Sequence, residues 1–430
     1  MRYRKAELFG IVCFALSCGG RTPFGNVSPL AGTGGHHGKG GSGATGGGAG
    51  AGGIRGGGGI AGTGGIKATG GTTWAAGTIS LGGTIGGGGT LPISTVVAAG
   101  QFHSCAMAED GTVRCWGYGY YGQLGNDSYE NSAKPVMVSG IHNAASIAAG
   151  GYNSCAGMRD GTVWCWGMND DFQLGTTDGS YSPVPIQIPG INDAIAVSLN
   201  AGHACALLST GLVQCWGRVY TGQPNAPDGA SSAVPMVAPG ISQAMAITTG
   251  EGHACAVLNN GSVSCWGQNF IGQLGDGTTN ASPTPVKVVG IDRAARVAAG
   301  SNHTCALLAD DSILCWGANY AGELGDGTQE SSSVPVRVSG ITNAGAISGG
   351  TCALLRYGYL KCWGPGLVGQ GAAGPFTLEI FYEAALSVGQ GHACFARDYG
   401  VVACWGENQY GQLGDGTTID RAAPVDVRGL

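Results

Sequence analysis

Cysteine recurs at regular intervals after residue 90 of this 430-residue chain. Two cysteines can form a disulfide, and a cluster of them can hold a metal ion. Here they fall into seven pairs, ten residues apart, and the second cysteine of every pair begins the tripeptide Cys-Trp-Gly. Zinc sites usually leave only two to four residues between cysteines, so this spacing favours disulfides. The pairs are Cys105 with Cys115, Cys155 with Cys165, Cys205 with Cys215, Cys255 with Cys265, Cys305 with Cys315, Cys352 with Cys362 and Cys394 with Cys404.

The turn inside each pair indicates how its two cysteines face one another. If residues 109–111 form a three-residue hairpin loop whose last residue is left-handed, Cys105 lies directly opposite Cys115. Opposed cysteines at a non-hydrogen-bonded pair lie within bridging distance, so we predict seven disulfides, one in each hairpin. The residue types at the last loop position tolerate the left-handed conformation. They are Gly111, Gly161, Gly211, Gly261, Asp311, Gly358 and Gly400.

Each repeat consists of short β-strands. A short apolar run, the cysteine hairpin and a further short strand make four strands per unit, which is the composition of a propeller blade. The folded region starts with the first strand of a unit, at 93–100, and stops with the last strand of a unit, at 424–427. The polar capping repeats that an open solenoid needs are not visible. We therefore predict an all-β fold, a closed seven-bladed β-propeller of four-stranded blades.

Two further patterns suggest ligand binding. A ring of imidazoles in a central channel could bind a metal or an anion, although equal positions in different blades are spread around an axis and do not converge on one ion. The Asp-Gly-Thr stretches at 276–278, 326–328 and 415–417 lack the alternating carboxylates and distal glutamate of a calcium loop, so we interpret them as turns. The repeated histidines, two residues before the first cysteine of a pair, are His103, His203, His253, His303 and His392.

No catalytic constellation is recognisable. The chain has no nucleophile elbow, no zinc-protease motif and no phosphate loop in the required context. Paired carboxylates from distant blades could still hydrolyse a glycoside, because sequence spacing does not test that arrangement. We predict a protein without enzymatic activity and without a cofactor or a metal ion.

Aromatic side chains follow the Cys-Trp-Gly tripeptides, in loops that gather on one face of a propeller. Such a surface is typical of protein interfaces and of sugar stacking, although packing between blades accounts for the same pattern. The loops of the second and third units depart most from the repeat and are our candidates for specificity. The candidate partner-binding residues are Tyr118, Tyr120, Tyr121, Asp170, Asp171, Phe172, Arg218, Tyr220, Phe270, Tyr320 and Tyr410.

The first 92 residues differ from the rest. A basic start precedes a nine-residue apolar run that is too short to span a bilayer, and Cys18 follows in a pattern that resembles a bacterial lipoprotein signal. Simple secretion and a retained N-terminus are the alternatives. Residues 19–92 are rich in Gly, Thr, Ala and Ser without apolar periodicity, which predicts a flexible tether. We divide the chain into a signal peptide at 1–18 with Cys18 as the lipidation site, a disordered linker at 19–92 and the propeller at 93–430.

Charge limits the partners. Residues 1–92 carry seven Lys or Arg and one Glu, whereas residues 93–430 carry thirteen basic and twenty-five acidic residues, a net charge of −12. Nucleic-acid binding requires clustered cations on the folded part, so we expect no nucleic-acid partner. We expect a monomer that is exported to the cell envelope or the medium, where disulfides persist. Membrane attachment would occur only through a lipid on Cys18.

Three stretches of the fifth unit carry a family resemblance: 303–308 (HTCALL), 315–319 (CWGAN) and 322–328 (GELGDGT). With the Gly-Gln-Leu-Gly stretches of other units, they resemble the regulator of chromosome condensation repeat family over residues 93–430. The resemblance implies a seven-bladed propeller, structural histidines hydrogen-bonded to backbone in each blade and, for the cysteine pairs, an exported bacterial member. The family's namesake is a guanine-nucleotide exchange factor that also binds chromatin, and a secreted bacterial relative inhibits β-lactamases by protein–protein contact.

Fold does not settle function, so three hypotheses remain open. The first is a non-enzymatic, exported or surface-tethered binding propeller that contacts a protein or a glycan through one loop face. The second is a guanine-nucleotide exchange factor like the namesake, which would act in the cytosol. The third is a polysaccharide-active enzyme or a lectin.

Overall fold

The computed structural model describes residues 95–218, 231–364, 376–379, 385–397 and 400–430. The predicted signal peptide, the lipidation site Cys18, the linker and Tyr220 lie outside these residues. In the described part of the chain, no helix is long and apolar enough to cross a membrane.

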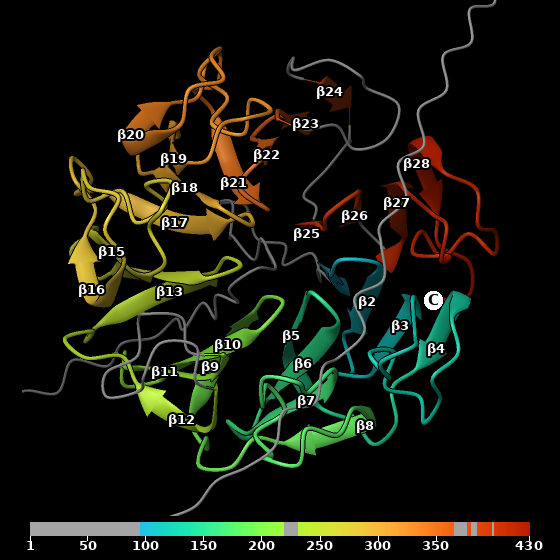
Figure 1. The fold of residues 1–430 in the computed structure, drawn as a ribbon. Helices are drawn as coiled ribbons and strands as arrows, with labels where there is room; N and C mark the ends of the chain where they lie inside the picture. Colours follow the sequence, from blue (N-terminus) through green and yellow to red (C-terminus); the bar gives the residue numbers. More distant parts are fainter. Residues whose placement is uncertain (1–94, 219–230, 365–375, 380–384, 398–399) are drawn as a thin grey trace, which may run out of the picture. The chain divides into compact units, whose positions relative to one another are not determined.

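Among the described residues, twenty-eight strands form seven four-stranded antiparallel sheets, and the strands of every sheet follow one another in chain order. The sheets are the blades of a propeller (Figure 1), which confirms the predicted fold class. Blades one to four consist of β1 (Thr95–Ala99), β2 (His103–Ala108), β3 (Val113–Gly117), β4 (Ser132–Met137); β5 (Ala144–Gly150), β6 (Asn153–Met158), β7 (Val163–Gly167), β8 (Ser182–Gln187); β9 (Ala194–Leu199), β10 (His203–Leu208), β11 (Val213–Arg218), β12 (Ser231–Val237); β13 (Ala244–Thr249), β14 (His253–Leu258), β15 (Val263–Gly267) and β16 (Ser282–Lys287). Blades five to seven consist of β17 (Ala294–Ala299), β18 (His303–Leu308), β19 (Ile313–Gly317), β20 (Ser332–Arg337); β21 (Ala344–Ser348), β22 (Cys352–Leu355), β23 (Tyr359–Cys362), β24 (Phe376–Glu379); β25 (Ala385–Val388), β26 (His392–Ala396), β27 (Val402–Gly406) and β28 (Arg421–Asp426).

The cysteine hairpins have the predicted geometry. The last loop residue of every hairpin has a positive φ, from 65° at Asp311 to 84° at Gly161. The two cysteines of each pair face one another on adjacent strands, and a disulfide joins them with both sulfur-bearing residues buried. All seven predicted bridges are present. They join Cys105 to Cys115, Cys155 to Cys165, Cys205 to Cys215, Cys255 to Cys265, Cys305 to Cys315, Cys352 to Cys362 and Cys394 to Cys404.

The outer strands are longer than predicted. We expected the last strand at 424–427, but β28 begins at Arg421, because Gly406 of β27 pairs with Arg421 across a β-bulge. The outer strands also contain proline, for example Pro135 in β4. Proline lacks the N–H group that a further strand would need, so it protects a free sheet edge against unwanted pairing.

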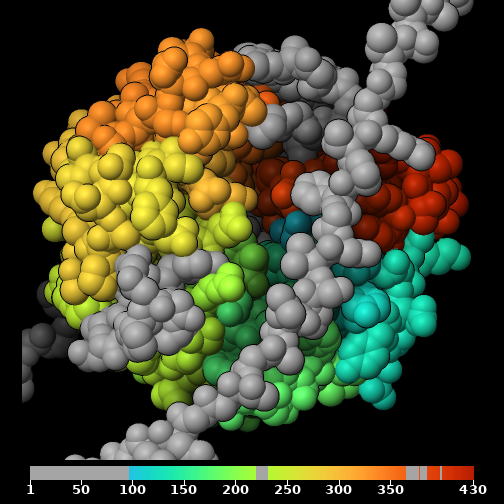
Figure 2. All heavy atoms as spheres, in the orientation of Figure 1, coloured from blue at the N-terminus to red at the C-terminus, as the bar shows by residue number. Residues whose placement is uncertain are grey.

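Seven hydrophobic clusters hold the ring together, one between each pair of neighbouring blades. Between blades one and two, for example, Met107 packs with Ile147 and Trp166. The cluster between blades seven and one contains Leu413 and Trp116. Figure 2 shows the last blade in red beside the first blade in cyan. The two ends of the propeller therefore meet through the same kind of core as any other neighbours, as the closed ring requires.

In the described part of the chain, five tryptophans of the Cys-Trp-Gly tripeptides bond their blade to the blade before it. Trp166 Nε1 donates to the carbonyl oxygen of Gln123 at 2.9 Å, in the loop between β3 and β4. Trp116 makes the same bond to Gln412 of blade seven at 2.8 Å, which closes the ring without exchange of a strand. Gly125 has a φ of 70°, and a Cβ there would lie 2.6 Å from Nε1 of Trp166, so the contact requires glycine. The bond recurs at Trp216, Trp316 and Trp363.

Candidate binding face

Two loops of each blade lie on the same side of the propeller, which we call the long-loop face. They are the loops between the first and second strands and between the third and fourth strands. Backbone hydrogen bonds join them: Tyr118 N donates to Phe102 O at 2.9 Å in blade one, and Glu407 N donates to Gly391 O at 2.8 Å in blade seven. The cysteine hairpin loops lie at the other end of the strands. Any binding site built from the variable loops is therefore on the long-loop face.

Seven aromatic rings on the long-loop face form one continuous group over blades seven, one and two, which we call the tyrosine platform. Its members are Phe102, Tyr118, Tyr120, Tyr121, Tyr152, Tyr181 and Tyr410. The ring centroid of Tyr118 lies 4.7 Å from that of Tyr410 and 6.0 Å from that of Tyr152. Tyr120 is 62% exposed, and the other rings are partly buried. Contacts between the rings thus hold the platform in place, and part of its aromatic surface remains exposed to solvent.

Two of the platform phenols, those of Tyr118 and Tyr152, have a raised pKa and are protonated at neutral pH. Burial raises the pKa of Tyr118 and of Tyr152 above the ordinary value, and neighbouring tyrosines raise both further. Tyr181 Oη donates to Asp170 Oδ2 at 3.4 Å. A protonated phenol both donates and accepts hydrogen bonds. The platform therefore combines flat apolar faces with hydrogen-bonding groups, as protein interfaces do.

Six of the predicted partner-binding residues are aromatic side chains that fall into two groups. Those that belong to the tyrosine platform are Tyr118, Tyr120, Tyr121 and Tyr410. Phe270 and Tyr320 are strongly exposed, at 70% and 68%, but they belong to blades four and five. No ring among the described residues contacts either of them, so the structure brings together only the aromatics of blades seven, one and two.

The predicted specificity residues of blades two and three have partners within the propeller. Asp171 Oδ1 lies 3.2 Å from Arg218 Nε, and both side chains are thereby engaged in an ion pair. Asp170 accepts the hydrogen bond from Tyr181 at the edge of the platform. Phe172 has a φ of 62°, a conformation that costs a residue with a side chain more than it costs glycine. Other blades have glycine there, as at Gly122.

Three platform residues are not identified by the pattern of the long loops alone. Phe102 and Tyr152 come directly before the repeated histidine position, in the short loop between the first and second strands. Tyr181 directly precedes β8. Because successive strands of a blade run in opposite directions, the short loop lies on the same face as the long one. Phe102 and Tyr152 could have been predicted from this topology.

The long-loop face is strongly acidic. Among the described residues, its loops contain thirteen carboxylates and no Lys or Arg. The carboxylates are Asp127, Glu130, Asp170, Asp171, Asp178, Glu251, Asp276, Glu323, Asp326, Glu330, Glu407, Asp415 and Asp420. The loops of the opposite face carry both signs, including Arg159, Arg293 and Arg356. The negative charge of the propeller is therefore concentrated on the face that bears the platform.

A cavity of about 560 Å³ lies at the centre of the ring and is lined by residues from all seven blades. In the described part of its lining, Glu251 and Glu323 are the only acidic side chains, and there is no Lys or Arg. Gln101 lines the cavity, and the next residue, Phe102, belongs to the tyrosine platform. The cavity and the platform therefore meet at the loop between β1 and β2.

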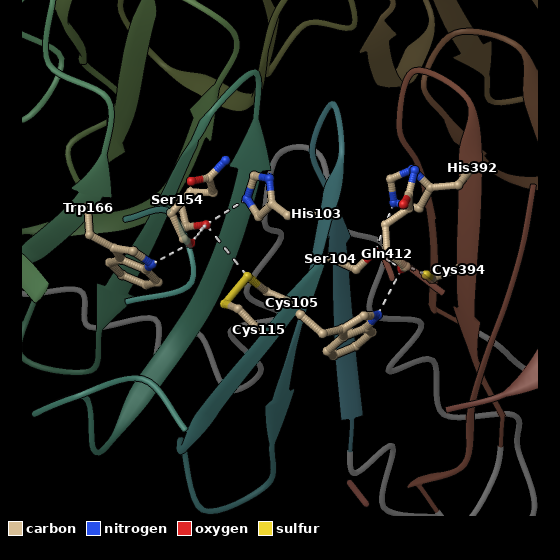
Figure 3. Close-up of a disulfide and its surroundings, with 11 residues drawn as sticks. His103, Ser104, Cys105, Cys115, Ser154, Trp166, His392, Cys394 and Gln412 are labelled. Carbon is tan, nitrogen blue, oxygen red and sulfur yellow. Dashed lines mark hydrogen bonds between the residues drawn. A yellow bond between two sulfur atoms is a disulfide. The ribbon is translucent and has the colours of Figure 1, made fainter. Parts of the chain in front are cut away.

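Three of the repeated histidines join neighbouring blades. His103 Nε2 bonds to Ser154 Oγ of blade two at 2.8 Å, and His392 Nε2 bonds to Ser104 Oγ of blade one at 2.8 Å (Figure 3). Ser154 Oγ donates its own proton to Gln123 O at 3.0 Å, so His103 is the donor toward the serine. His253 bonds to Thr304 of the next blade in the same way. A hydroxyl of the next blade is a partner that the sequence did not predict.

Burial keeps these imidazoles neutral. It lowers the pKa of His103 and His253 to about 3 and that of His203 and His392 to about 4, and it also lowers the pKa of His303. The described residues contain no group of three or more His, Cys, Asp or Glu side chains that could hold a metal ion. His103, His253 and His392 accordingly act as contacts between neighbouring blades.

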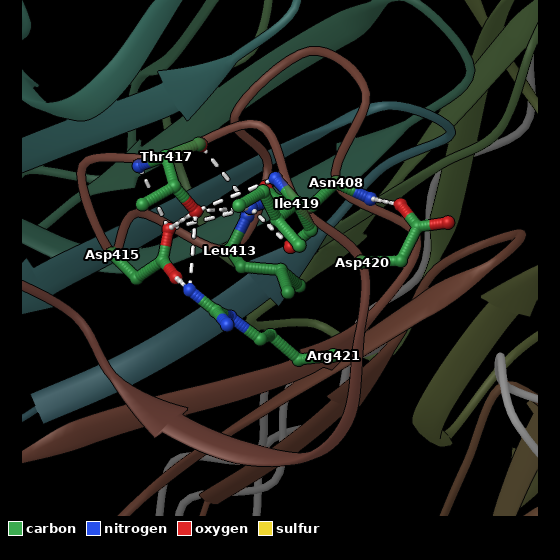
Figure 4. A network of polar contacts seen from close by, with 7 residues as sticks. All are labelled: Asn408, Leu413, Asp415, Thr417, Ile419, Asp420 and Arg421. Atoms are coloured by element: carbon green, nitrogen blue, oxygen red, sulfur yellow. Dashed lines mark hydrogen bonds and ion pairs between the residues drawn. The ribbon is translucent and has the colours of Figure 1, made fainter.

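The Asp-Gly-Thr stretches form turns, as predicted. In blade seven, Asp415 Oδ1 accepts from Thr417 N at 2.9 Å, and Oδ2 accepts from Arg421 Nη2 at 2.8 Å (Figure 4). Asn408 Nδ2 donates to the carbonyl oxygens of Thr417 and Ile419 at 3.1 and 3.0 Å. The same asparagine contacts recur in blades four and five. The carboxylate oxygens are occupied by donors of their own loop.

Comparison with known proteins shows repeats of one family. The family described as "Regulator of chromosome condensation (RCC1) repeat" matches residues 110–156, 160–207, 260–307, 310–351 and 399–430. A second family of the same description matches residues 95–123, 144–173, 246–273 and 294–323. The mitochondrial RCC1 domain-containing protein RUG3 of Arabidopsis thaliana is 40% identical over 47 residues, which is 11% of this chain and 11% of that protein.

Solved structures share the propeller fold. Human WBSCR16 superposes with a TM-score of 0.67 at 22% identity, over 74% of this chain and 95% of that one. Prp20p of Saccharomyces cerevisiae, whose structure is described together with its binding to Gsp1p and histones, superposes with a TM-score of 0.64 at 21% identity, over 75% of this chain and 87% of that one. At these identities the likeness shows the fold alone.

Proposed function

The chain belongs to the family of regulator of chromosome condensation (RCC1) repeat proteins, and we propose that it is an exported, non-enzymatic propeller that binds a protein partner on its tyrosine platform. The observation that carries this proposal is the continuous group of partly exposed rings over blades seven, one and two. Tyrosine is enriched in protein interfaces, where it supplies contact area and hydrogen bonds together. The aspartates of the Asp-Gly-Thr turns and three of the repeated histidines are bonded within the propeller.

Two observations support export. The first is the N-terminal pattern of a basic start, a short apolar run and Cys18. The second is that all fourteen cysteines of the propeller form disulfides. Disulfides persist in oxidising compartments and are rare in the cytosol. We propose the cell envelope as the location, with Cys18 as the lipid-bearing residue.

Export is tested by changing Cys18 in the full chain. We expect the wild-type protein to incorporate labelled palmitate and to fractionate with membranes, whereas Cys18→Ser abolishes the label and releases the protein to the medium or the periplasm. Globomycin, which blocks lipoprotein signal cleavage, should cause an unprocessed form to accumulate. A protein that stays cytosolic and unlabelled in every case would remove the basis for the proposal and favour an exchange factor.

Binding is tested by changing the platform. In pull-downs with the full chain from envelope and medium extracts, we expect Tyr118→Ala with Tyr120→Ala to weaken capture of the partner about 30-fold, since central interface tyrosines are worth about 2 kcal/mol or more. The matched control is Tyr357→Ala, because Tyr357 is 81% exposed and lies in a hairpin loop at the other end of the strands.

The same experiment separates the hypotheses. Capture that survives the platform variants, or that the Tyr357 control reduces equally, contradicts the proposed interface. Binding of purified chain to a glycan array, lost in the same platform variants, would replace the protein partner by a sugar, since tyrosine rings also stack on sugars. Release of sugar from bound glycans would instead indicate an enzyme with dispersed carboxylates.

A further inference from the structure

The two carboxylates of the central cavity are not needed for the fold. Glu323 stands where other blades have glutamine, and its Oε2 accepts from Ala321 N at 2.8 Å. Gln123 Oε1 accepts from Tyr121 N at 3.0 Å in the equivalent place of blade one. A neutral amide therefore performs the same structural task. The negative charge of Glu323 is therefore not required for this hydrogen bond.

Glu251 also stands where other blades have glutamine. It follows the glycine at the end of the innermost strand of blade four, and the equivalent residues of blades one and seven are Gln101 and Gln390. All three line the cavity. The backbone N–H of Glu251 donates to Ser301 O at 2.9 Å. Its carboxylate is exposed and faces a cavity whose described lining contains no Lys or Arg.

A third group at the cavity, His303, lacks the hydroxyl partner that its equivalents in other blades have. His303 is 6% exposed and lines the cavity, and its Nε2 bonds to no side chain among the described residues. The corresponding atoms of His103, His253 and His392 all bond to a hydroxyl of the next blade. The difference arises because the turn before Cys352 is three residues shorter than its equivalents. A Cβ on Gly350 would lie 2.5 Å from His303 Nε2, so the imidazole packs against the backbone of this shortened turn.

We propose that the cavity receives a Lys or Arg side chain of the protein partner, while the residues beside that side chain lie on the tyrosine platform. The inference rests on the proposed function and specifies the chemistry of its partner. Glu251 and Glu323 supply the opposite charge, and a cation meets no like charge in the described lining. Gln101 and Phe102 connect the cavity to the platform, so one extended segment reaches both.

The platform itself favours the same partner. The faces of tyrosine rings attract cations, and Arg stacks on them. The loops around the platform carry carboxylates and, in the described part, no Lys or Arg. Arg218 and Arg421, at strand ends beside these loops, pair with Asp171 and Asp415, and the remaining carboxylates leave the face with a net negative charge. An acidic or phosphorylated partner would therefore meet net repulsion on this face, whereas a basic segment is attracted to it.

The role of the two cavity carboxylates is tested by replacing Glu251 and Glu323 with glutamine, the residue at the equivalent positions of other blades. The probe is an array of random peptides of about fifteen residues that span negative to positive net charge, bound to the purified full chain. We expect the bound peptides to be enriched in Arg and Lys. For the tightest of them in solution, we expect E251Q/E323Q to weaken binding about tenfold, and replacement of its Arg by the neutral isostere citrulline to do the same. Raising the salt from about 50 to about 300 mM should weaken wild-type binding and affect E251Q/E323Q less.

The matched control is Asp292→Asn, which removes one charge from the 84% exposed side chain of Asp292 on the opposite face and should leave binding unchanged. Thermal unfolding of E251Q/E323Q should match wild type, because glutamine occupies both positions in other blades. Bound peptides without an excess of Arg and Lys, or an affinity unchanged in E251Q/E323Q, would overturn the inference. If the charge test fails but the double variant Tyr118→Ala with Tyr120→Ala still weakens capture of the partner, the proposed function of the platform stands. Only the inference that the partner presents a Lys or Arg side chain is then wrong.

Discussion

Acidification from about pH 7 to about pH 4 is expected to destabilise the propeller steeply, because its buried histidines are neutral in the folded state. Burial lowers the pKa of His103 and His253 to about 3 and that of His203 and His392 to about 4, from an ordinary value of 6.5. In the unfolded chain these groups bind protons below about pH 6.5, whereas in the folded protein they do so only near pH 3 to 4. Stability is therefore complete above pH 6.5 and is lost as the pH falls through this window.

The expected size is large. A pKa shift of one unit corresponds to about 1.4 kcal/mol, so each of the four histidines accounts for roughly 3 to 5 kcal/mol at the low end of the window. Their sum is comparable to the total stability of a typical domain, which is about 5 to 15 kcal/mol. Urea unfolding at about pH 7, 6, 5 and 4 measures the effect directly. A free energy of unfolding that stays constant between about pH 6.5 and 4 would contradict it.

A natural control exists within the chain. Blade two has Asn153 at the histidine position, and its Nδ2 donates to Met168 O at 2.6 Å. His103→Asn should therefore fold and should reduce the proton uptake on unfolding by one, which lowers the pH slope by about 1.4 kcal/mol per pH unit. The aspartates with lowered pKa, such as Asp110 and Asp160, change the free energy of unfolding only below about pH 4. They therefore do not contribute to the pH dependence expected between about pH 6.5 and 4.

Reduction of the disulfides is the second change with a large expected effect. Each bridge closes a loop of ten residues, which is worth about 2 to 3 kcal/mol on chain-entropy grounds. Complete reduction should therefore cost more than the stability of a typical domain. We expect dithiothreitol together with urea to unfold the propeller at a urea concentration far below the midpoint of the oxidised protein, with the shift followed by circular dichroism.

The order of reduction is also expected to be uneven. Thirteen of the cysteines are at most 2% exposed, whereas Cys362 is 8% exposed, and both Cys352 and Cys362 line the central cavity. Mild reductant without urea should open the bridge between Cys352 and Cys362 first and leave the other bridges intact, as mass spectrometry of alkylated peptides would show. Fourteen free thiols in the untreated folded protein would refute the bridges altogether.

The repeat made most of the fold predictable, and particular residues show why. Gly111 and its equivalents mark the left-handed end of the hairpin loop, and the ten-residue spacing then leaves one register in which Cys105 meets Cys115. Both constraints are local. The start of β28 was missed because the bulge that pairs Gly406 with Arg421 depends on contacts across the sheet.

The binding face was only partly predictable, because it depends on which blades are neighbours. Tyr118 and Tyr410 are nearly 300 residues apart, yet their rings lie 4.7 Å apart, because closure of the ring places blade seven beside blade one. The same closure brings His392 to Ser104. Phe270 has the same pattern in sequence but no aromatic neighbour among the described residues, so spacing alone did not distinguish it from the platform.

The ring closes through Trp116 and Gln412 and through a shared apolar core, and every blade is one uninterrupted stretch of chain. Among the described residues, every sheet consists of consecutive strands, so closure of the ring does not require a strand shared between its first and last blades. A circular permutant that opens between blades one and two would keep every sheet whole. In evolutionary terms, such a ring can arise by tandem duplication of a gene segment for one blade, because each new copy brings both halves of its contact with the next.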